Sequence, residues 1–233
     1  MIRLFKLAFS LVFLLVLLVV ADRLAARVAG QVVADRIKAS QHLTTTPEVT
    51  VDGFPFLTQL VRGTYDQVDA SAVDINRGKV RASSLTLHLH GVHLKAVDVL
   101  SQSVKAISVD RADGTVVLSY ADVNALVQPE GIKVTPAKNG SLVVSGSLKL
   151  AGQTVKGSGT GSVAAVPAGI QVTVSNIKAA GLSSSLTSLL VSKLSFVIPT
   201  SSLPYGVSVQ SVHAAADGVT VTAVSGPFTI PVG

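Results

Sequence analysis

The sequence of 233 residues contains no cysteine and no tryptophan, and only 4% of its residues are aromatic. The absence of cysteine excludes a disulfide framework, a thiolate metal site, a cysteine nucleophile and a cysteine-linked lipid anchor. Charged residues are also scarce, at 14%, and after Asn139 the only acidic residue is Asp217. The formal net charge of +6 suits contact with anionic lipid headgroups, although a charge excess that serves only solubility is an equally good interpretation.

One long apolar run stands at the start of the chain. Arg3 and Lys6 precede an apolar block that ends at Ala21, and the charged pair Asp22 and Arg23 follows it. A basic flank before an apolar block is typical of segments that enter a membrane and direct export of the remaining chain. We therefore expect a single-pass membrane protein with its N-terminus inside and its domain in the extracytoplasmic, periplasmic space.

Two interpretations of residues 1–21 stay open. Extended back to Leu4, the run is 18 residues long with one charge, Lys6. At about 1.5 Å per residue it measures roughly 27 Å, enough for a thin hydrocarbon core. A helical pattern continues past this run, which favours an uncleaved signal anchor. Val19-Val20-Ala21 would also suit a signal peptidase, and cleavage there would give a secreted protein.

Residues 22–43 are predicted to form a helix that is either a stalk or packed against the domain. Charged residues take one side of this segment, and four apolar residues recur at nearly helical spacing. The four are Leu24, Val28, Val32 and Ile37. A polar stretch ending at Pro47 follows, and we place the domain at residues 44–233.

Within residues 44–233 the apolar pattern switches to period two, which predicts half-buried strands. The strands are expected at Val49–Val51, Tyr65–Ile75, Val80–Leu94, Val104–Val109, Thr115–Leu118, Ile132–Thr135, Leu142–Leu150, Thr154–Val163, Ile170–Ile177, Val207–Ala214 and Val219–Val224. Tight hairpins are favoured at Asp113-Gly114, Asn139-Gly140, Ala151-Gly152 and Asp217-Gly218.

Three short helices interrupt the strands. Val97–Ser103 is a weak pattern, and Tyr120–Val127 begins at a capping box formed by Ser119 and Asp122. Ser184–Leu194 carries a leucine stripe, which consists of Leu186, Leu189, Leu190 and Leu194. Many antiparallel strands with few helices predict an α+β fold.

The stretch from Val51 to Leu60 reads Val-Asp-Gly-Phe-Pro-Phe-Leu-Thr-Gln-Leu, and Gly63, Tyr65, Val68 and Val73 follow it. This motif resembles the hallmark of the LmeA-like phospholipid-binding family of actinobacterial envelope proteins. The agreement extends to the order of the N-terminal membrane segment, the short helix, the motif, a later Leu203-Pro204-Tyr205-Gly206 and Asp217-Gly218.

The resemblance implies a tubular lipid-binding (TULIP-like) architecture, in which a strongly curved antiparallel sheet wraps around a helix and leaves an apolar groove. It further implies phospholipid ligands and a role in the synthesis or maintenance of cell-envelope lipids or lipoglycans.

The motif supplies the first candidate lipid contacts. Pro55 fixes φ and removes a donor, so the chain must turn sharply before a short apolar element. The expected lipid contacts are Phe54, Phe56, Leu57, Leu60, Val61, Leu186, Leu190 and Leu194. The motif would form the lip of a lipid groove or a membrane-touching loop; equally, it could be an apolar plug that closes one end of the core.

Four cations are candidates for the phospholipid headgroup. Arg62 follows the apolar element directly, and Arg77, Lys79 and Arg81 alternate in sequence beside Asn76-Gly78. Guanidinium and ammonium groups bind phosphate by charge-assisted hydrogen bonds. A solvated strand face is the commoner explanation of such an alternation.

Other chemistry has little support in the sequence. His88, His90 and His93 could suggest a metal, but we expect solvent-facing strand histidines and no metal site or cofactor. The glycine-rich stretch 156–162 lacks the lysine that follows the last glycine of a phosphate loop, so a strand is expected there. No nucleophile elbow is present, and basic residues are not interleaved with aromatic ones, so neither an enzyme nor a nucleic-acid partner is expected.

The sequence therefore predicts an extracytoplasmic, membrane-associated protein that binds phospholipids, with anionic headgroups preferred. A structural envelope scaffold without a ligand is the alternative, and an enzyme that acts on lipid-linked glycans is a weaker one.

Overall fold

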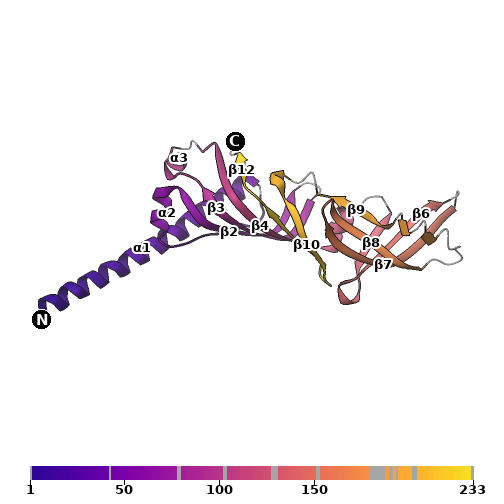
Figure 1. Cartoon of the computed structure of the whole chain (residues 1–233), viewed down its shortest axis with the longest axis horizontal. Coiled ribbons are helices and arrows are strands. Elements are labelled where there is room, and N and C mark those ends of the chain that lie inside the picture. The colour runs from indigo at the N-terminus through magenta and orange to yellow at the C-terminus, as the bar shows by residue number, and fades with distance from the viewer. Residues whose placement is uncertain are drawn as a thin grey trace. The chain divides into compact units, whose positions relative to one another are not determined.

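The computed structural model describes the chain except residues 1, 42, 78–79, 102–103, 127–130, 151–152, 179–186, 189–190, 193, 201–203 and 232–233. It is an α+β protein with two antiparallel sheets, which confirms the predicted fold class (Figure 1). The chain divides into two compact units. Unit 1 comprises residues 1–72, 87–112 and 227–233, and unit 2 comprises residues 73–86 and 113–226.

The larger sheet has the strand order β1-β2-β3-β4-β11-β10, with β12 paired to β4. Its strands are β1 Glu48–Asp52, β2 Thr64–Arg77, β3 Val80–His93, β4 Ala106–Leu118, β10 Ser208–Ala214, β11 Val219–Ser225 and β12 Phe228–Pro231. The other sheet has the order β5-β6-β7-β8-β9. Its strands are β5 Ile132–Pro136, β6 Leu142–Leu150, β7 Gln153–Val166, β8 Gly169–Lys178 and β9 Phe196–Pro199.

The helices are short except for the first. They are α1 Ile2–Gln41, α2 Phe56–Arg62, α3 Ala96–Leu100 and α4 Tyr120–Leu126, with 3-10 turns η1 Lys138–Gly140 and η2 Pro204–Gly206. The apolar run and the segment after it therefore belong to one continuous helix, α1. Its length and composition would allow it to cross a membrane.

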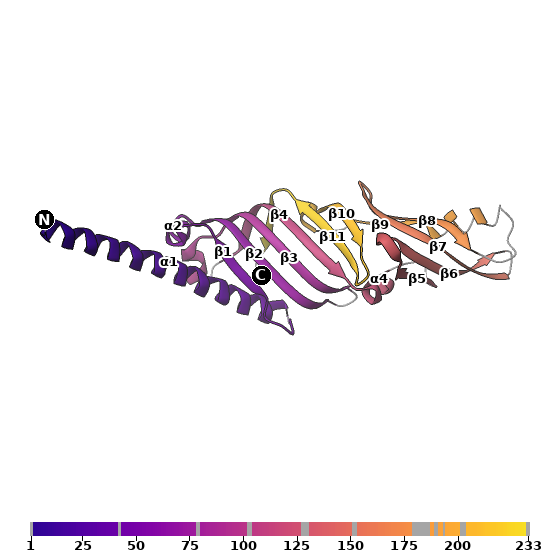
Figure 2. The same cartoon turned by 90° about the horizontal axis from the view of Figure 1, so that it is seen from below.

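The second half of α1 lies along β1 (Figure 2). The buried stripe of the helix has four-residue spacing and consists of Asp22, Ala26, Gly30 and Ala34. A Cβ atom on Gly30 would lie only 2.3 Å from the carbonyl oxygen of Val49 in β1, so glycine permits this close approach.

The apolar spacing pointed to a different stripe of this helix. Leu24, Val28 and Val32 are 52–59% exposed. Small residues form the contact because the helix backbone approaches the strand too closely for larger side chains.

The core of unit 1 lies between α1, α2 and the sheet. Its buried residues are Ala26, Phe56, Tyr65, Val92 and Val109. The core of unit 2 is built mainly by the five-stranded sheet around Leu194, which is 0% exposed. Within β7, a Cβ on Gly161 would lie 2.7 Å from Val144 Cγ2, so this glycine makes room for a neighbouring core side chain. The glycine-rich stretch is a strand, as predicted.

Most predicted strands are present, with informative differences. The hairpin predicted at Asp113-Gly114 is wrong, because both residues lie inside β4. This strand pairs with β12 over Ala106–Val109 and also borders β11, so it changes partner instead of turning back. The hairpins at Asn139-Gly140 and Asp217-Gly218 are confirmed. Strands β9 and β12 were not predicted from the pattern.

Candidate functional site

The Gly-Phe-Pro-Phe-Leu-Thr-Gln motif forms a turn and α2, and α1 holds both in place. The Asp22 carboxylate, on α1, accepts hydrogen bonds from the backbone N–H groups of Phe56 (3.0 Å) and Leu57 (2.8 Å). These are donors of the first turn of α2, which would otherwise lack partners. The Arg23 guanidinium donates to Asp22 (2.7 Å) and to the carbonyl oxygen of Gly53 (2.7 Å). The first polar residues after the apolar run thus bind the motif.

Gly53 leaves the space that the side chain of Gln59 occupies. Gly53 has a φ of +97°, and a Cβ there would lie 2.5 Å from Nε2 of Gln59. Gln59 is 4% exposed. Its amide donates to the carbonyl oxygen of Asp52 (3.2 Å) and accepts from the N–H of Asp66 (2.8 Å). The buried amide therefore joins β1 to β2 beneath the turn.

The apolar side chains of the motif divide into two groups. Phe56 is 2% exposed and its ring lies 6.2 Å from that of Tyr65, centroid to centroid, in the core of unit 1. By contrast, Phe54, Leu57 and Val61 are 61%, 39% and 89% exposed. One motif thus contains both a packing element and a surface apolar element, and the lipid contact of these residues stays a prediction.

Of the three remaining predicted lipid contacts, the structure describes only Leu194. Leu194 is a core residue of unit 2, whereas the motif belongs to unit 1. Thr187, Ser188, Val191, Ser192 and Leu194 are helical, in agreement with the predicted leucine helix, but Leu186 and Leu190 lie outside the described residues.

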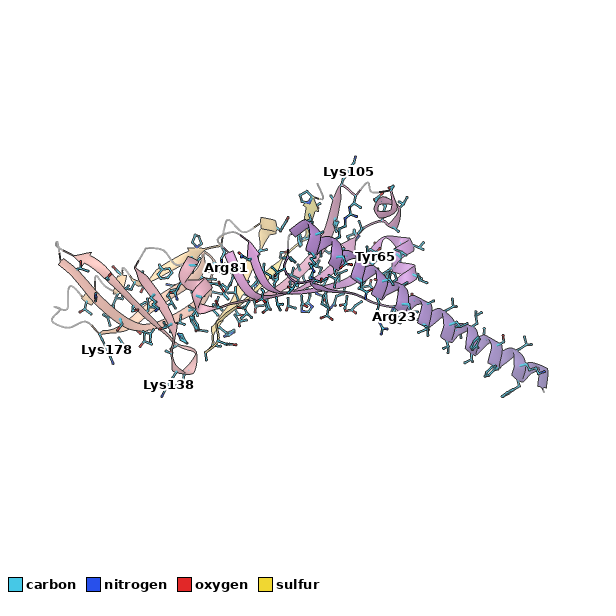
Figure 3. The ribbon with its side chains drawn as sticks, turned by 180° about the vertical axis from the view of Figure 1, so that it is seen from behind. Arg23, Tyr65, Arg81, Lys105, Lys138 and Lys178 are labelled. Atoms are coloured by element: carbon cyan, nitrogen blue, oxygen red, sulfur yellow. The ribbon has the colours of Figure 1, made fainter. Side chains whose placement is uncertain are left out.

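Of the predicted headgroup cations, Arg62 belongs to unit 1, whereas Arg77 and Arg81 belong to unit 2. Arg62 is exposed at the end of α2. Arg81, labelled in Figure 3, is exposed near the start of β3, in unit 2. Arg77 ends β2, and Lys79 lies outside the described residues. Sequence reasoning did not identify the exposed Lys95, whose Cα would lie 3.2 Å from a Cβ on Gly63 at the end of α2. Only the fold brings these two segments together.

Unit 1 contains many apolar side chains that are only partly buried. Ten partly buried residues pack against the five buried ones: Ala25, Ala29, Val51, Leu60, Val68, Leu89, Leu94, Ile107, Phe228 and Ile230. They come from α1, from α2 and its neighbouring segments, and from β1 to β4 and β12. An apolar surface that remains partly accessible can bury an acyl chain.

Unit 2 contains an open recess of about 350 Å³. It is lined by Ala165, Val166, Pro167, Thr200, Val207, Ser208, Val209 and Gln210. Its volume lies at the lower end of the range for ligand pockets, about 300–1,000 Å³. Hydroxyl and amide groups make up part of its wall, which suits an acyl chain less well than a wholly apolar wall.

The strand histidines contact carboxylates. Nδ1 of His88 lies 2.8 Å from Asp69, and Nε2 of His93 lies 3.1 Å from Asp110. Burial alone would raise the pKa of Asp69, but hydrogen bonds from His88 and Gln67 hold it below its ordinary value. Among the residues that the structure describes, no group of three or more histidine and acidic side chains could hold a metal.

Asp52 lies beside Asp69 and has the opposite perturbation. Burial raises the pKa of Asp52, and the neighbouring Asp69 carboxyl raises it further. Arg23 acts in the other direction through its positive charge. The end of β1 next to the motif is therefore coupled electrostatically to α1 and β2.

The fold and the motif agree with a comparison against known families. A family model described as LmeA-like phospholipid-binding matches residues 20–224 of the 233. No curated protein and no solved structure matches the chain. The match begins two residues before Asp22 and includes β1 to β10 and β11 except for its last residue. The chain therefore belongs to the LmeA-like phospholipid-binding family.

Proposed function

We propose that this protein is an extracytoplasmic phospholipid-binding protein, held at the membrane by the first half of α1. Anionic phospholipids are its ligands, and its role is to support the synthesis or maintenance of cell-envelope lipids or lipoglycans. The family supports lipid binding, and the basic flank at Arg3 and Lys6 supports an N-terminus on the cytoplasmic side. The proposal adds the location, the headgroup class and the biological role.

The observation that carries the proposed site is the partly covered apolar surface in unit 1. Leu60, Leu89, Ile107, Phe228 and Ile230 all pack against the core yet keep part of their surface accessible. We assign the acyl chain to this surface. Burial of each methylene contributes about 0.8 kcal/mol, so one chain supplies several kcal/mol before the entropic cost of binding.

The residues predicted from the sequence take different parts in this proposal. Leu60, on α2, contacts the acyl chain. Phe56, at the start of the same helix, is buried in the core of unit 1 and so holds α2 in place. Arg62 at the end of the same helix is the proposed headgroup contact in unit 1. Leu194 would act only indirectly, through the core of unit 2.

The site can be mapped with a phospholipid that carries a photoactivatable diazirine on its acyl chain. The full chain, reconstituted in vesicles, should give adducts on β3, β4 and β12. An Ile107→Asn substitution should reduce the yield of adducts, whereas Ser108→Asn, on the exposed face of the same strand, should not. Adducts confined to residues 165–167 and 207–210 would transfer the site to the recess of unit 2.

The competing functions make different predictions in the same experiment. A structural scaffold whose interior is filled by its own side chains would give no adducts on β3, β4 or β12 or in the recess of unit 2. An enzyme that acts on lipid-linked glycans would chemically change a glycolipid added to the same vesicles, whereas a binding protein would leave it intact.

Orientation needs a separate test. A reporter fused after Gly233 should be active only when the domain is exported. Activity of a cytoplasmic reporter in that fusion would contradict the proposed location.

A further inference from the structure

Exposed apolar side chains of unit 1 are concentrated in one place. Among the described residues of unit 1 outside α1, the large apolar side chains that are exposed are Phe54, Leu57, Val61 and Val97. The first three belong to α2 and the turn before it, and Val97, which is 63% exposed, belongs to α3. Exposed apolar side chains that cluster together mark an interaction surface, whereas scattered ones do not.

The two short helices are neighbours. The N–H of Leu94 donates to the carbonyl oxygen of Gly63, at 3.0 Å, and so joins the end of α2 to the segment that leads into α3. In Figure 1, α2 and α3 lie at the end of unit 1 from which the first half of α1 extends. We call this set the membrane edge: Phe54, Leu57, Val61, Val97 and the exposed cations Arg62 and Lys95.

The position of α2 along α1 identifies what the membrane edge faces. The apolar run ends at Ala21, so a bilayer crossed by α1 has its boundary at about Asp22. The carboxylate of Asp22 is hydrogen-bonded to the first turn of α2. α2 is therefore fixed at the level where the helix leaves the hydrocarbon core.

The charges of this region fit a lipid surface. Arg23, Arg62 and Lys95 carry positive charge there, and the Asp22 carboxylate is already paired with Arg23. Asp98 is the acidic residue of α3. Apolar side chains flanked by cations are the composition of segments that lie in the headgroup and acyl boundary of anionic membranes.

We propose that the membrane edge inserts into the headgroup and acyl boundary of the leaflet from which α1 emerges. Unit 1 is then seated on the bilayer by two contacts, the spanning helix and the membrane edge. This inference depends on an uncleaved α1 and goes beyond the proposed function. A seated protein could take a phospholipid directly from that leaflet, without passage of the acyl chain through water.

The absence of tryptophan from the sequence makes a direct test simple. Single reporters are introduced as Val61→Trp and Val97→Trp in the full chain, which is reconstituted in vesicles of phosphatidylcholine and phosphatidylglycerol. The matched control is Ala39→Trp, an exposed position near the end of α1. It lies 18 residues beyond Ala21, roughly 27 Å along the helix axis.

Tryptophan at 61 and 97 should emit at shorter wavelength than tryptophan at 39. Lipids brominated near the headgroup end of the acyl chain should quench the first two reporters and leave the control unchanged. Equal emission and equal quenching at positions 61 and 39 would overturn the inference.

The result is independent of the lipid site. Quenching at position 61 without phospholipid adducts on β3, β4 or β12 or in the recess of unit 2 would retain the membrane edge and contradict the proposed function. Adducts on β3, β4 and β12 without quenching at position 61 would support the lipid site and contradict the membrane edge.

Discussion

Phe54 and Phe56 are two residues apart, and the same substitution should affect them differently. Phe56 is 2% exposed and contacts Tyr65 in the core of unit 1. Replacing a buried phenylalanine with alanine costs about 3–5 kcal/mol, because apolar contact is lost and a cavity remains. For a chain of this size that corresponds to a fall of roughly 6–20 °C in melting temperature.

Phe54→Ala should have a much smaller effect on stability. The side chain is 61% exposed, and the Cζ atom of Arg23 lies 5.2 Å from its ring centroid. A cation–π contact at an exposed site contributes about 0.5–1 kcal/mol. Phe54→Ala should therefore lower the melting temperature by only about 1–4 °C, but it should weaken the quenching of tryptophan at position 61 by brominated lipid.

The change in stability is measured by thermal unfolding of both full-length variants in detergent, monitored by circular dichroism. The vesicle quenching experiment measures the change in contact between the membrane edge and lipid. A similar loss of stability in both variants would refute the assignment of one phenylalanine to the core and the other to the surface. Unchanged stability of Phe56→Ala would refute the packing of α2 against the sheet.

Two further substitutions test the packing of each unit. In unit 1, Gly30→Ala improves intrinsic helix propensity by about 1 kcal/mol, yet its Cβ would approach the carbonyl oxygen of Val49 to 2.3 Å. We therefore expect Gly30→Ala to lower the free energy of unfolding in urea. The control Gln31→Ala, at an exposed neighbouring position, should be nearly neutral. A more stable Gly30→Ala variant would be inconsistent with the α1–β1 contact. In unit 2, Leu194→Asp buries an unpaired charge at a side chain that is 0% exposed, so it should prevent folding of the unit. The control Ser188→Asp, at an exposed position, should have a melting temperature within a few degrees of the wild-type value.

The strands were largely predictable because the sheet residues alternate between covered and exposed faces. The pattern in β5, for example, has Ile132 and Val134 buried on either side of the exposed Lys133. Turn chemistry also predicted the β10–β11 hairpin correctly. The same chemistry failed at Asp113-Gly114, because local preference carries no information about a strand that exchanges one partner for another.

The packing face of α1 could not be read from hydrophobicity. A helix that approaches a strand closely buries small residues, so Ala26, Gly30 and Ala34 make the contact while Leu24 and Val28 remain exposed. Close approach is a property of the tertiary structure, and apolar periodicity does not report it.

The candidate site was only partly visible in the sequence. The motif itself was evident, but its division into a buried and an exposed group depends on the hydrogen bonds that the Asp22 carboxylate accepts from the backbone of α2. Lys95 and Val97 join the same edge through a fold contact between segments about 30 residues apart in the chain. No short-range pattern in the sequence links them.

The central claim, that this domain binds phospholipid, is tested most directly by native mass spectrometry of the full chain released from the membranes in which it was made. The account predicts a folded protein that carries phospholipid as a discrete mass increment, enriched in anionic species and exchangeable with added lipid. A folded protein that carries no phospholipid, even when anionic phospholipid is supplied in excess, would contradict it.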